Sequence, residues 1–203
     1  MNDNNIRYDI ERVLKVYDPD KRLDEYFLLL MEENEKVNLV SRETSPSDLK
    51  RLAAESLLPC EIIERVHPDF IADRYLDIGS GGGLPAVPLL LAHKVTAAAL
   101  VERTVKKAVA LERIVKKLQL HARVVAKNFE EAVFDKTFNL ITLRYIKLTD
   151  ALLKKIFINL SLGGFFVYYA PTELETYKNL SRTFQYSSTE DAVVKSLTLY
   201  QKK

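Results

Sequence analysis

The sequence has little of the residue types on which metal binding and covalent catalysis most often depend. Cys60 is the only cysteine, which excludes an internal disulfide framework and leaves no thiolate cluster for zinc. The three histidines, His67, His93 and His121, lie far apart and lack the paired spacing of a metal site. We therefore expect no metal, and we interpret Cys60 as a buried residue and the histidines as loop or surface residues.

Long apolar runs are missing as well. No stretch approaches the roughly 18 consecutive apolar residues that a membrane-spanning helix needs. Residues 1–12 carry three acidic side chains and lack the apolar segment of a secretory signal. The length of 203 residues, with 47% hydrophobic and 29% charged residues, is typical of one globular domain with a small appendage. We expect a cytoplasmic monomer with no membrane partner.

The first third of the chain has the pattern of helices. Apolar positions recur at three- and four-residue spacing over residues 6–16 and 23–37. A third helix has a clear start signal, because Ser45 and Asp48 have the spacing of a capping box. Pro59 is expected to bend or end that helix.

Beyond residue 74, short apolar runs alternate with helical segments, which is typical of βαβ units and a parallel sheet. The expected strands are residues 75–78, 95–101, 122–126, 138–143, 165–170 and 193–200. The expected helices are residues 86–93, 104–118, 149–160 and 173–182. We therefore predict an α/β fold with a doubly wound, Rossmann-like sheet and helices on both faces. Residues 67–203 would form this domain, and residues 1–66 an N-terminal helical extension.

Glycine is scarce, and its distribution points to a ligand. All six glycines fall in two places, and four of them occupy the five positions from Gly79 to Gly83, after a strand and before a helix. A structural turn needs only one or two glycines, whereas a backbone without Cβ atoms lets a ligand touch the chain. In a doubly wound sheet this is where a nucleotide-like ligand binds.

The spacing of the glycines distinguishes two kinds of cofactor. The dinucleotide fingerprint G-x-G-x-x-G needs a closing glycine that this loop lacks. The chain instead reads acid-x-Gly-x-Gly-x-Gly, from Asp77 through Gly79 and Gly81 to Gly83. The acid can order the loop or meet a cationic ligand through water. S-adenosylmethionine carries an ammonium and a sulfonium, whereas a dinucleotide brings a pyrophosphate to a helix N-terminus. We therefore predict binding of S-adenosylmethionine.

Glu102 ends the next predicted strand, 23 positions after Gly79. Nucleotide sites of α/β proteins place a carboxylate here, which accepts hydrogen bonds from ribose hydroxyls. The alternative is a surface carboxylate that forms a weak ion pair with Arg103 or Lys106.

Positive charge is concentrated in one segment. The net charge is only +2, but residues 103–127 hold eight basic residues against one acid, a net charge of +7. The segment is interpreted either as a phosphate-binding surface or as a solvated helix face that acids elsewhere balance. In the first case Arg103, Lys106 and Lys107 would lie nearest the cofactor and bind RNA.

Several of these motifs resemble those of the 16S ribosomal RNA guanine-N7 methyltransferases, also called the glucose-inhibited division protein B family. The similar segments, in the family's order, are residues 34–39 (Asn-Glu-Lys-Val-Asn-Leu), 76–88, 102–107, 129–131 and Arg144. The resemblance implies a methyltransferase that modifies N7 of a guanine in 16S ribosomal RNA or in the assembling small ribosomal subunit. The expected cofactor-binding residues are Asp77, Gly79, Gly81, Gly83, Leu84, Glu102, Phe129, Glu130 and Arg144.

Arg144 is also our candidate catalytic residue. Guanine N7 has an in-plane lone pair, so methyl transfer needs no base to remove a proton, and catalysis would depend on alignment and desolvation. Arg144 would position either the cofactor carboxylate or the guanine. A surface salt-bridge arginine is the alternative interpretation.

The substrate side departs from the family's pattern. Leu52 stands where the family has a histidine, Tyr145 and Ile146 stand where it has Ala-Phe, and the lysine expected after the fifth strand is missing around Ala170. A second hypothesis is therefore a paralogue that binds S-adenosylmethionine but has a changed substrate or a non-catalytic role.

Overall fold

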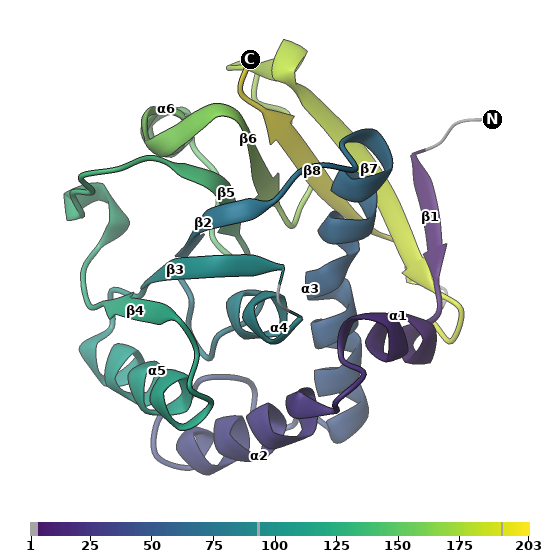
Figure 1. Cartoon of the computed structure of the whole chain (residues 1–203), viewed down its shortest axis with the longest axis vertical. Coiled ribbons are helices and arrows are strands. Elements are labelled where there is room, and N and C mark those ends of the chain that lie inside the picture. The colour runs from purple at the N-terminus through teal and green to yellow at the C-terminus, as the bar shows by residue number, and fades with distance from the viewer. Residues whose placement is uncertain (1–3, 93, 192) are drawn as a thin grey trace.

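The computed structural model describes residues 4–92, 94–191 and 193–203, and its centre is one mixed eight-stranded sheet (Figure 1). The strands are β1 (Asn5–Tyr8), β2 (Ala72–Ile78), β3 (Val95–Val101), β4 (Ala122–Val125), β5 (Phe138–Leu143), β6 (Leu160–Tyr168), β7 (Ser181–Ser188) and β8 (Lys195–Gln201). Their order in the sheet is β1-β7-β8-β6-β5-β2-β3-β4. β8 runs antiparallel to both neighbours, whereas the other pairs are parallel.

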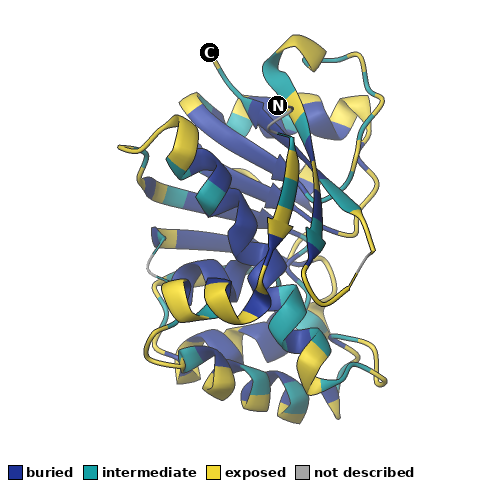
Figure 2. Cartoon of the chain, turned by 90° about the vertical axis from the view of Figure 1, so that its right-hand side faces the viewer, coloured by how far each residue is buried: buried dark blue, intermediate teal, exposed yellow. Residues whose placement is uncertain are grey.

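Helices cover both faces of the sheet. They are α1 (Ile10–Tyr17), α2 (Arg22–Asn34), α3 (Pro46–Val66), α4 (Ala86–Leu91), α5 (Val105–Lys117) and α6 (Asp150–Asn159), with 3-10 turns η1 (Phe129–Glu131) and η2 (Lys178–Leu180). Helices α1 to α5 pack in one hydrophobic core and α6 in a second core on the opposite face. Figure 2 shows buried strands between helices whose outer sides are exposed. The predicted doubly wound α/β fold is confirmed.

Neighbouring residues of one strand serve different cores, as the alternation of a pleated strand requires. On β2, Tyr75 packs in the core with α1 to α5, and Leu76 packs in the core with α6. Both side chains are fully buried. A strand covered on both faces therefore has a continuous apolar run, and the central strands show this pattern in the sequence.

The helix expected over residues 6–16 is wrong at its start. Asn5–Tyr8 form β1, and α1 begins at Ile10 after Asp9, whose side chain accepts a hydrogen bond from the amide of Arg12. β1 pairs in parallel with β7, so the N-terminal segment supplies an edge strand as well as helices.

Helix α3 has the predicted capping box but does not end at Pro59. The amide of Asp48 donates to Ser45 Oγ, and the amide of Ser45 donates to Asp48 Oδ2, each over 3.1 Å. The helix continues through Pro59 to Val66, and Leu57 and Leu58, which precede Pro59, are fully buried. Burial therefore outweighs the hydrogen bond that proline removes.

The helix expected over residues 173–182 is wrong. This stretch holds η2 and the start of β7, in which Phe184, Tyr186 and Ser188 are buried and the residues between them are not. β7 and β8 form an antiparallel pair, so the sheet is mixed rather than all parallel.

The bounds of β3 and β5 are those predicted, whereas β6, expected over residues 165–170, spans Leu160–Tyr168 and begins directly after α6. The other elements lie close to their expected bounds. Cys60 is buried, and His67 and His121 are exposed, as expected, whereas His93 lies outside the described residues. None of the helices in the described ranges has the length and apolar character needed to cross a membrane.

Candidate functional site

A cavity of about 810 Å³ lies at the carboxyl ends of β2, β3, β4 and β5. In the sheet β2 has β3 on one side and β5 on the other, so the strand order reverses at β2. The cavity therefore lies at the switch point where α/β sheets bind ligands. Each strand contributes a turn to the lining, with Gly79 and Gly81 after β2, Glu102 after β3, Phe129 after β4 and Arg144 after β5. The volume is in the range of small-molecule sites.

The glycine loop brings bare backbone to this cavity. Gly79 and Gly81 have φ angles of +76° and +52°, which favour glycine. The amide of Gly79 donates to Val101 O over 2.8 Å, which ties the loop to β3. A Cβ on Gly79 would collide with the side chain of Ile146, whereas a Cβ on Gly81 would meet only Gly79 O, at 3.9 Å. Gly81 therefore leaves its surroundings open to a ligand.

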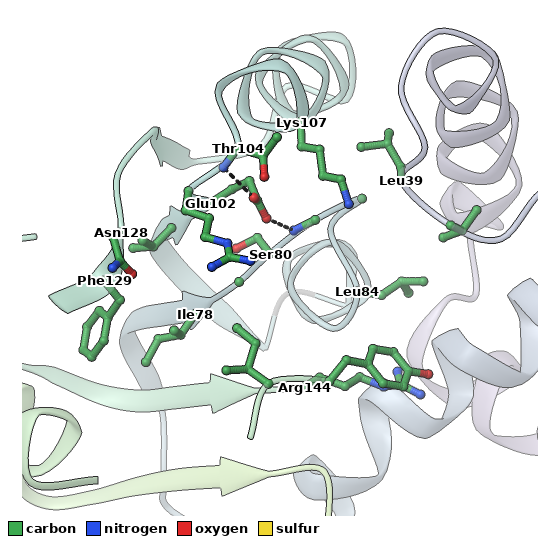
Figure 3. A pocket seen from close by; sticks show the side chains of 18 of the residues that line it. Leu39, Ile78, Ser80, Leu84, Glu102, Thr104, Lys107, Asn128, Phe129 and Arg144 are labelled. Atoms are coloured by element: carbon green, nitrogen blue, oxygen red, sulfur yellow. Dashed lines mark hydrogen bonds between the residues drawn. The ribbon is translucent and has the colours of Figure 1, made fainter. Parts of the chain in front are cut away.

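Glu102 is fixed in the cavity by two backbone amides (Figure 3). Gly81 N donates to its Oε2 over 3.0 Å, and Thr104 N donates to its Oε1 over 2.7 Å. The residue is 6% exposed, so it is not the surface carboxylate of the alternative interpretation. Each oxygen has further acceptor capacity, which hydroxyl groups of a ligand can use.

Asp77 lies behind the loop and does not line the cavity. Its Oδ1 accepts a hydrogen bond from Thr142 Oγ1 over 2.5 Å, and Thr142 Oγ1 lies 2.5 Å from the hydroxyl of Tyr75. Its Oδ2 is buried and has no hydrogen-bond partner among the described residues. Burial raises the pKa of Asp77 to about 6. The carboxyl thus links β2 to β5 beneath the glycine loop.

The other expected cofactor residues either line the cavity or support the packing around it. Phe129 lies at one end and Arg144 and Leu84 toward the other, with Glu102 between them (Figure 3). Glu130 lines the cavity from an exposed position. Gly83 does not line it; there a Cβ would lie 2.6 Å from Val87 Cγ2, so helix packing requires this glycine.

Arg144 is 5% exposed and is held by α3. One terminal nitrogen donates to Glu55 Oε2 over 2.6 Å, and the other lies 3.3 Å from Leu52 O and from Ser56 Oγ. Its guanidinium also lies over the ring of Tyr169, 5.2 Å from the centroid. Arg144 is therefore a buried, preoriented group rather than a surface salt-bridge residue.

Glu55 is the centre of a buried charge network. Besides Arg144, it accepts hydrogen bonds from Arg51 over 3.2 Å and from Lys195 over 2.5 Å. Three cations thus share one carboxylate that is 1% exposed. Arg144 is the buried member of the three, and removing the carboxylate would leave its charge without its acidic partner, which is strongly destabilising.

Residues of the N-terminal segment complete the site, and sequence reasoning missed them. Asn34 Oδ1 accepts hydrogen bonds from the amides of Leu39 (2.7 Å) and Val40 (3.0 Å), which line the cavity. The hydroxyl of Tyr26 donates to Gly82 O over 3.0 Å. The Asn-Glu-Lys-Val-Asn-Leu segment of residues 34–39 is the signal that could have found Asn34 and Leu39, but only the fold shows that it reaches the cavity.

The basic residues of segment 103–127 do not act as one group. Those that line the cavity are Arg103, Lys107 and Lys127. Lys106 is exposed on α5 outside the lining.

Others pair with acids of α2. Arg113 forms two hydrogen bonds of 3.1 Å from its Nε and a shorter one of 2.5 Å from its terminal nitrogen to Glu33, and Lys117 lies 3.4 Å from Glu32. Arg113 keeps the pKa of Glu33 below its ordinary value. Part of the positive charge is thus balanced in space, whereas Arg103, Lys107 and Lys127 form no salt bridge within the part of the chain that the structure describes.

Comparisons with known proteins agree with this architecture. The family model described as rRNA small subunit methyltransferase G matches residues 20–203. A Ribosomal RNA small subunit methyltransferase G from Helicobacter pylori is 30% identical over 178 residues, which cover 83% of this chain and 96% of that protein. One from Chlorobium chlorochromatii is 35% identical over 133 residues, covering 64% of this chain and 54% of that protein. The chain spans about half the length of the Chlorobium relatives that it matches.

Solved structures share the fold. A 16S rRNA N2 G1207 methyltransferase from T. thermophilus, in complex with AdoMet and guanosine, has a TM-score of 0.57 at 18% identity, covering 80% of this chain and 44% of that one. The N-methyltransferase NodS from Bradyrhizobium japonicum, in complex with S-adenosyl-L-homocysteine, has a TM-score of 0.56 at 14% identity, covering 87% and 98%. The family match extends over most of the chain, and the chain belongs to the rRNA small subunit methyltransferase G family.

Proposed function

We propose that this chain is an S-adenosylmethionine-dependent methyltransferase that methylates N7 of a guanine in 16S ribosomal RNA, free or in the assembling small subunit. The observation that carries the proposal is the buried carboxylate of Glu102, held by the amides of Gly81 and Thr104 in a cavity at the switch point of the sheet. Membership of the rRNA small subunit methyltransferase G family supports the same function.

The cavity lining fits the cofactor in the chemistry of its groups. Glu102 would accept hydrogen bonds from the ribose hydroxyls, and Phe129 would supply an apolar edge for the adenine. The open backbone at Gly81 would allow the amino acid part to approach. Behind the lining, the carboxyl of Asp77, whose Oδ2 has no hydrogen-bond partner among the described residues, would strengthen the attraction to an ammonium group through the loop. When bound, S-adenosylmethionine supplies an electrophilic methyl group on a sulfonium.

The protein then has to bind, orient and exclude water. Guanine N7 presents its lone pair without loss of a proton, so alignment of the reacting atoms is the main requirement. Arg144 suits a positioning role because Glu55, Ser56 and the carbonyl of Leu52 already fix its guanidinium. We propose that its remaining N–H groups hold the guanine or the cofactor carboxylate.

The charge at the cavity supports a polyanionic substrate. Arg103 and Lys127 are exposed and Lys107 is half-buried, and all three line the cavity, where Glu130 is the one exposed carboxylate among the described lining residues. Such cations attract phosphates. The second candidate, a paralogue with another substrate, is favoured by one observation: Leu52, which replaces the family's histidine, lines the cavity.

Two measurements test the proposal. Calorimetry should show binding of S-adenosylmethionine and no comparable binding of NAD. Small subunits from cells that lack the gene should gain N7-methylguanosine when incubated with the protein and S-adenosylmethionine. Cofactor binding without methyl transfer to RNA would favour the second candidate, and absence of cofactor binding would refute both.

A further inference from the structure

Tyr145 is an exposed aromatic residue at the cavity that belongs to neither hydrophobic core and is not among the expected cofactor residues. It follows β5, lines the cavity and is 82% exposed. The guanidinium of Arg144 lies over its ring, 4.9 Å from the centroid. Within the described residues, no aromatic ring packs on it. The ring thus has a cation beside it and a large surface left open.

The backbone holds this ring in place at an energetic cost. Tyr145 has a φ angle of +60°, in the left-handed region that residues other than glycine rarely adopt. Such strain persists where the surrounding structure imposes it, often at functional sites. Next to Tyr145, the side chain of Ile146 covers the Cα of Gly79, which fixes the direction in which the chain leaves β5.

Tyr177 provides an internal comparison. It also has a left-handed backbone, with a φ angle of +58°, but its ring is stacked on Phe157, with centroids 3.9 Å apart and an angle of 15° between the planes. The protein itself therefore fills the stacking surface of Tyr177. The equivalent surface of Tyr145 faces solvent at the cavity, where a ligand can fill it.

We propose that Tyr145 is the platform on which the base of the target nucleotide stacks, an inference that rests on the proposed RNA methyltransferase function. Proteins bind unpaired RNA bases by stacking them on aromatic side chains and by holding the phosphates with cations. Arg103 and Lys107 line the same cavity and supply the cations. The guanidinium of Arg144 lies over one face of the ring, which leaves the other face for the base.

Steady-state kinetics with unmethylated small subunits test this role. Tyr145→Ala should lower kcat/KM for the RNA roughly 5- to 150-fold, mainly through KM, because the base has no ring on which to stack. Tyr145→Phe should retain the parent's KM, because the ring is kept. The dissociation constant of S-adenosylmethionine, measured by calorimetry, should not change in either variant. Unchanged KM for Tyr145→Ala, with or without a lower Tm, would mean that the ring only shields Arg144.

A binding readout is independent of turnover. The chain has no tryptophan, so Tyr145→Trp introduces a single fluorescent reporter. A guanine-containing single-stranded oligoribonucleotide should quench it, and the same oligonucleotide with an abasic position in place of guanine should quench it less. Val133→Trp is the matched control, because Val133 is 88% exposed and does not line the cavity. Equal quenching in both variants would overturn the stacking proposal.

The two proposals can fail separately. If the parent protein neither binds S-adenosylmethionine nor methylates RNA, the proposed function is wrong. If the parent methylates RNA and Tyr145→Ala does so with the same KM and kcat, only the role of Tyr145 is wrong.

Discussion

Replacing Glu102 by alanine tests the centre of the site. The change removes a carboxylate that accepts hydrogen bonds from Gly81 N over 3.0 Å and from Thr104 N over 2.7 Å. Hydrogen bonds to a charged group contribute about 1.5–3 kcal/mol each, and water in the cavity would replace part of them. We expect the free energy of unfolding to fall by about 2–4 kcal/mol.

Cofactor binding should fall by a separate amount, because the ribose hydroxyls would have no acceptor. A decrease of about 1–3 kcal/mol corresponds to a roughly 5- to 150-fold higher dissociation constant for S-adenosylmethionine. Calorimetry at 25 °C measures it, and circular dichroism with a urea titration checks that the variant is folded. Glu131→Ala is the control, since Glu131 is exposed on η1 and does not line the cavity.

Glu102→Gln separates charge from shape. Its amide oxygen can accept one of the two backbone bonds, but its NH₂ group would face the other N–H donor. Binding by this variant should therefore resemble that of Glu102→Ala more than that of the parent. A folded Glu102→Ala protein with the parent's affinity would refute the placement of the ribose at this carboxylate.

Three further changes test other parts of the site. Gly81→Val should abolish cofactor binding in calorimetry while the fold persists. The control is Gly163→Val, at another open glycine with φ of +74°, which should cost similar stability and leave binding intact. Undiminished affinity of Gly81→Val would contradict the loop assignment. Replacing Lys106 and Lys107 by alanine should weaken RNA binding and leave cofactor affinity unchanged. The slope of the logarithm of the RNA binding constant against the logarithm of the salt concentration should become flatter by about 0.7–0.9 for each phosphate that the variant no longer neutralises. Parent-like binding at several salt concentrations would identify a solvated helix face. Burial raises the pKa of Asp77 to about 6, above its unfolded value of about 3.9, so the folded state binds the proton more tightly. The stability that comes from this proton is full below about pH 4 and is lost as the pH rises through about 6. In urea titrations the stability of the parent relative to Asp77→Asn should thus fall by up to about 3 kcal/mol between pH 4 and pH 7, and a constant difference would contradict this.

The sequence predicts those parts of the fold in which the local pattern and the packing agree. β3 and β5 are apolar runs buried on both faces, and the capping box at Ser45 starts α3 as expected. The prediction from the sequence fails where tertiary contacts determine the local structure. Pro59 does not end α3, because the helix is buried there, and residues 181 and 182 of the helix expected over residues 173–182 belong to β7, which pairs with β8.

The candidate site shows the same division. The glycine spacing and the position of Glu102 predict which turns meet at the switch point, and these turns do line one cavity. The sequence does not show that Asp77 lies behind the loop, or that Gly83 is needed for packing against Val87. Those facts depend on which way a side chain points, and a one-dimensional pattern does not fix that direction.

The pairing of β1 with β7 also has a consequence for how the chain reaches its folded state. Asn5 is paired with Gln185, so β1 cannot form its pairing until β7, near the other end of the sequence, has been synthesised. Contacts between residues so far apart in sequence slow folding, because a long loop must close before they form. During synthesis α1 to α5 and the central strands can assemble first, and β1 joins the sheet only after β7 and β8, because β8 lies between β7 and β6. The edge of the sheet is therefore completed last.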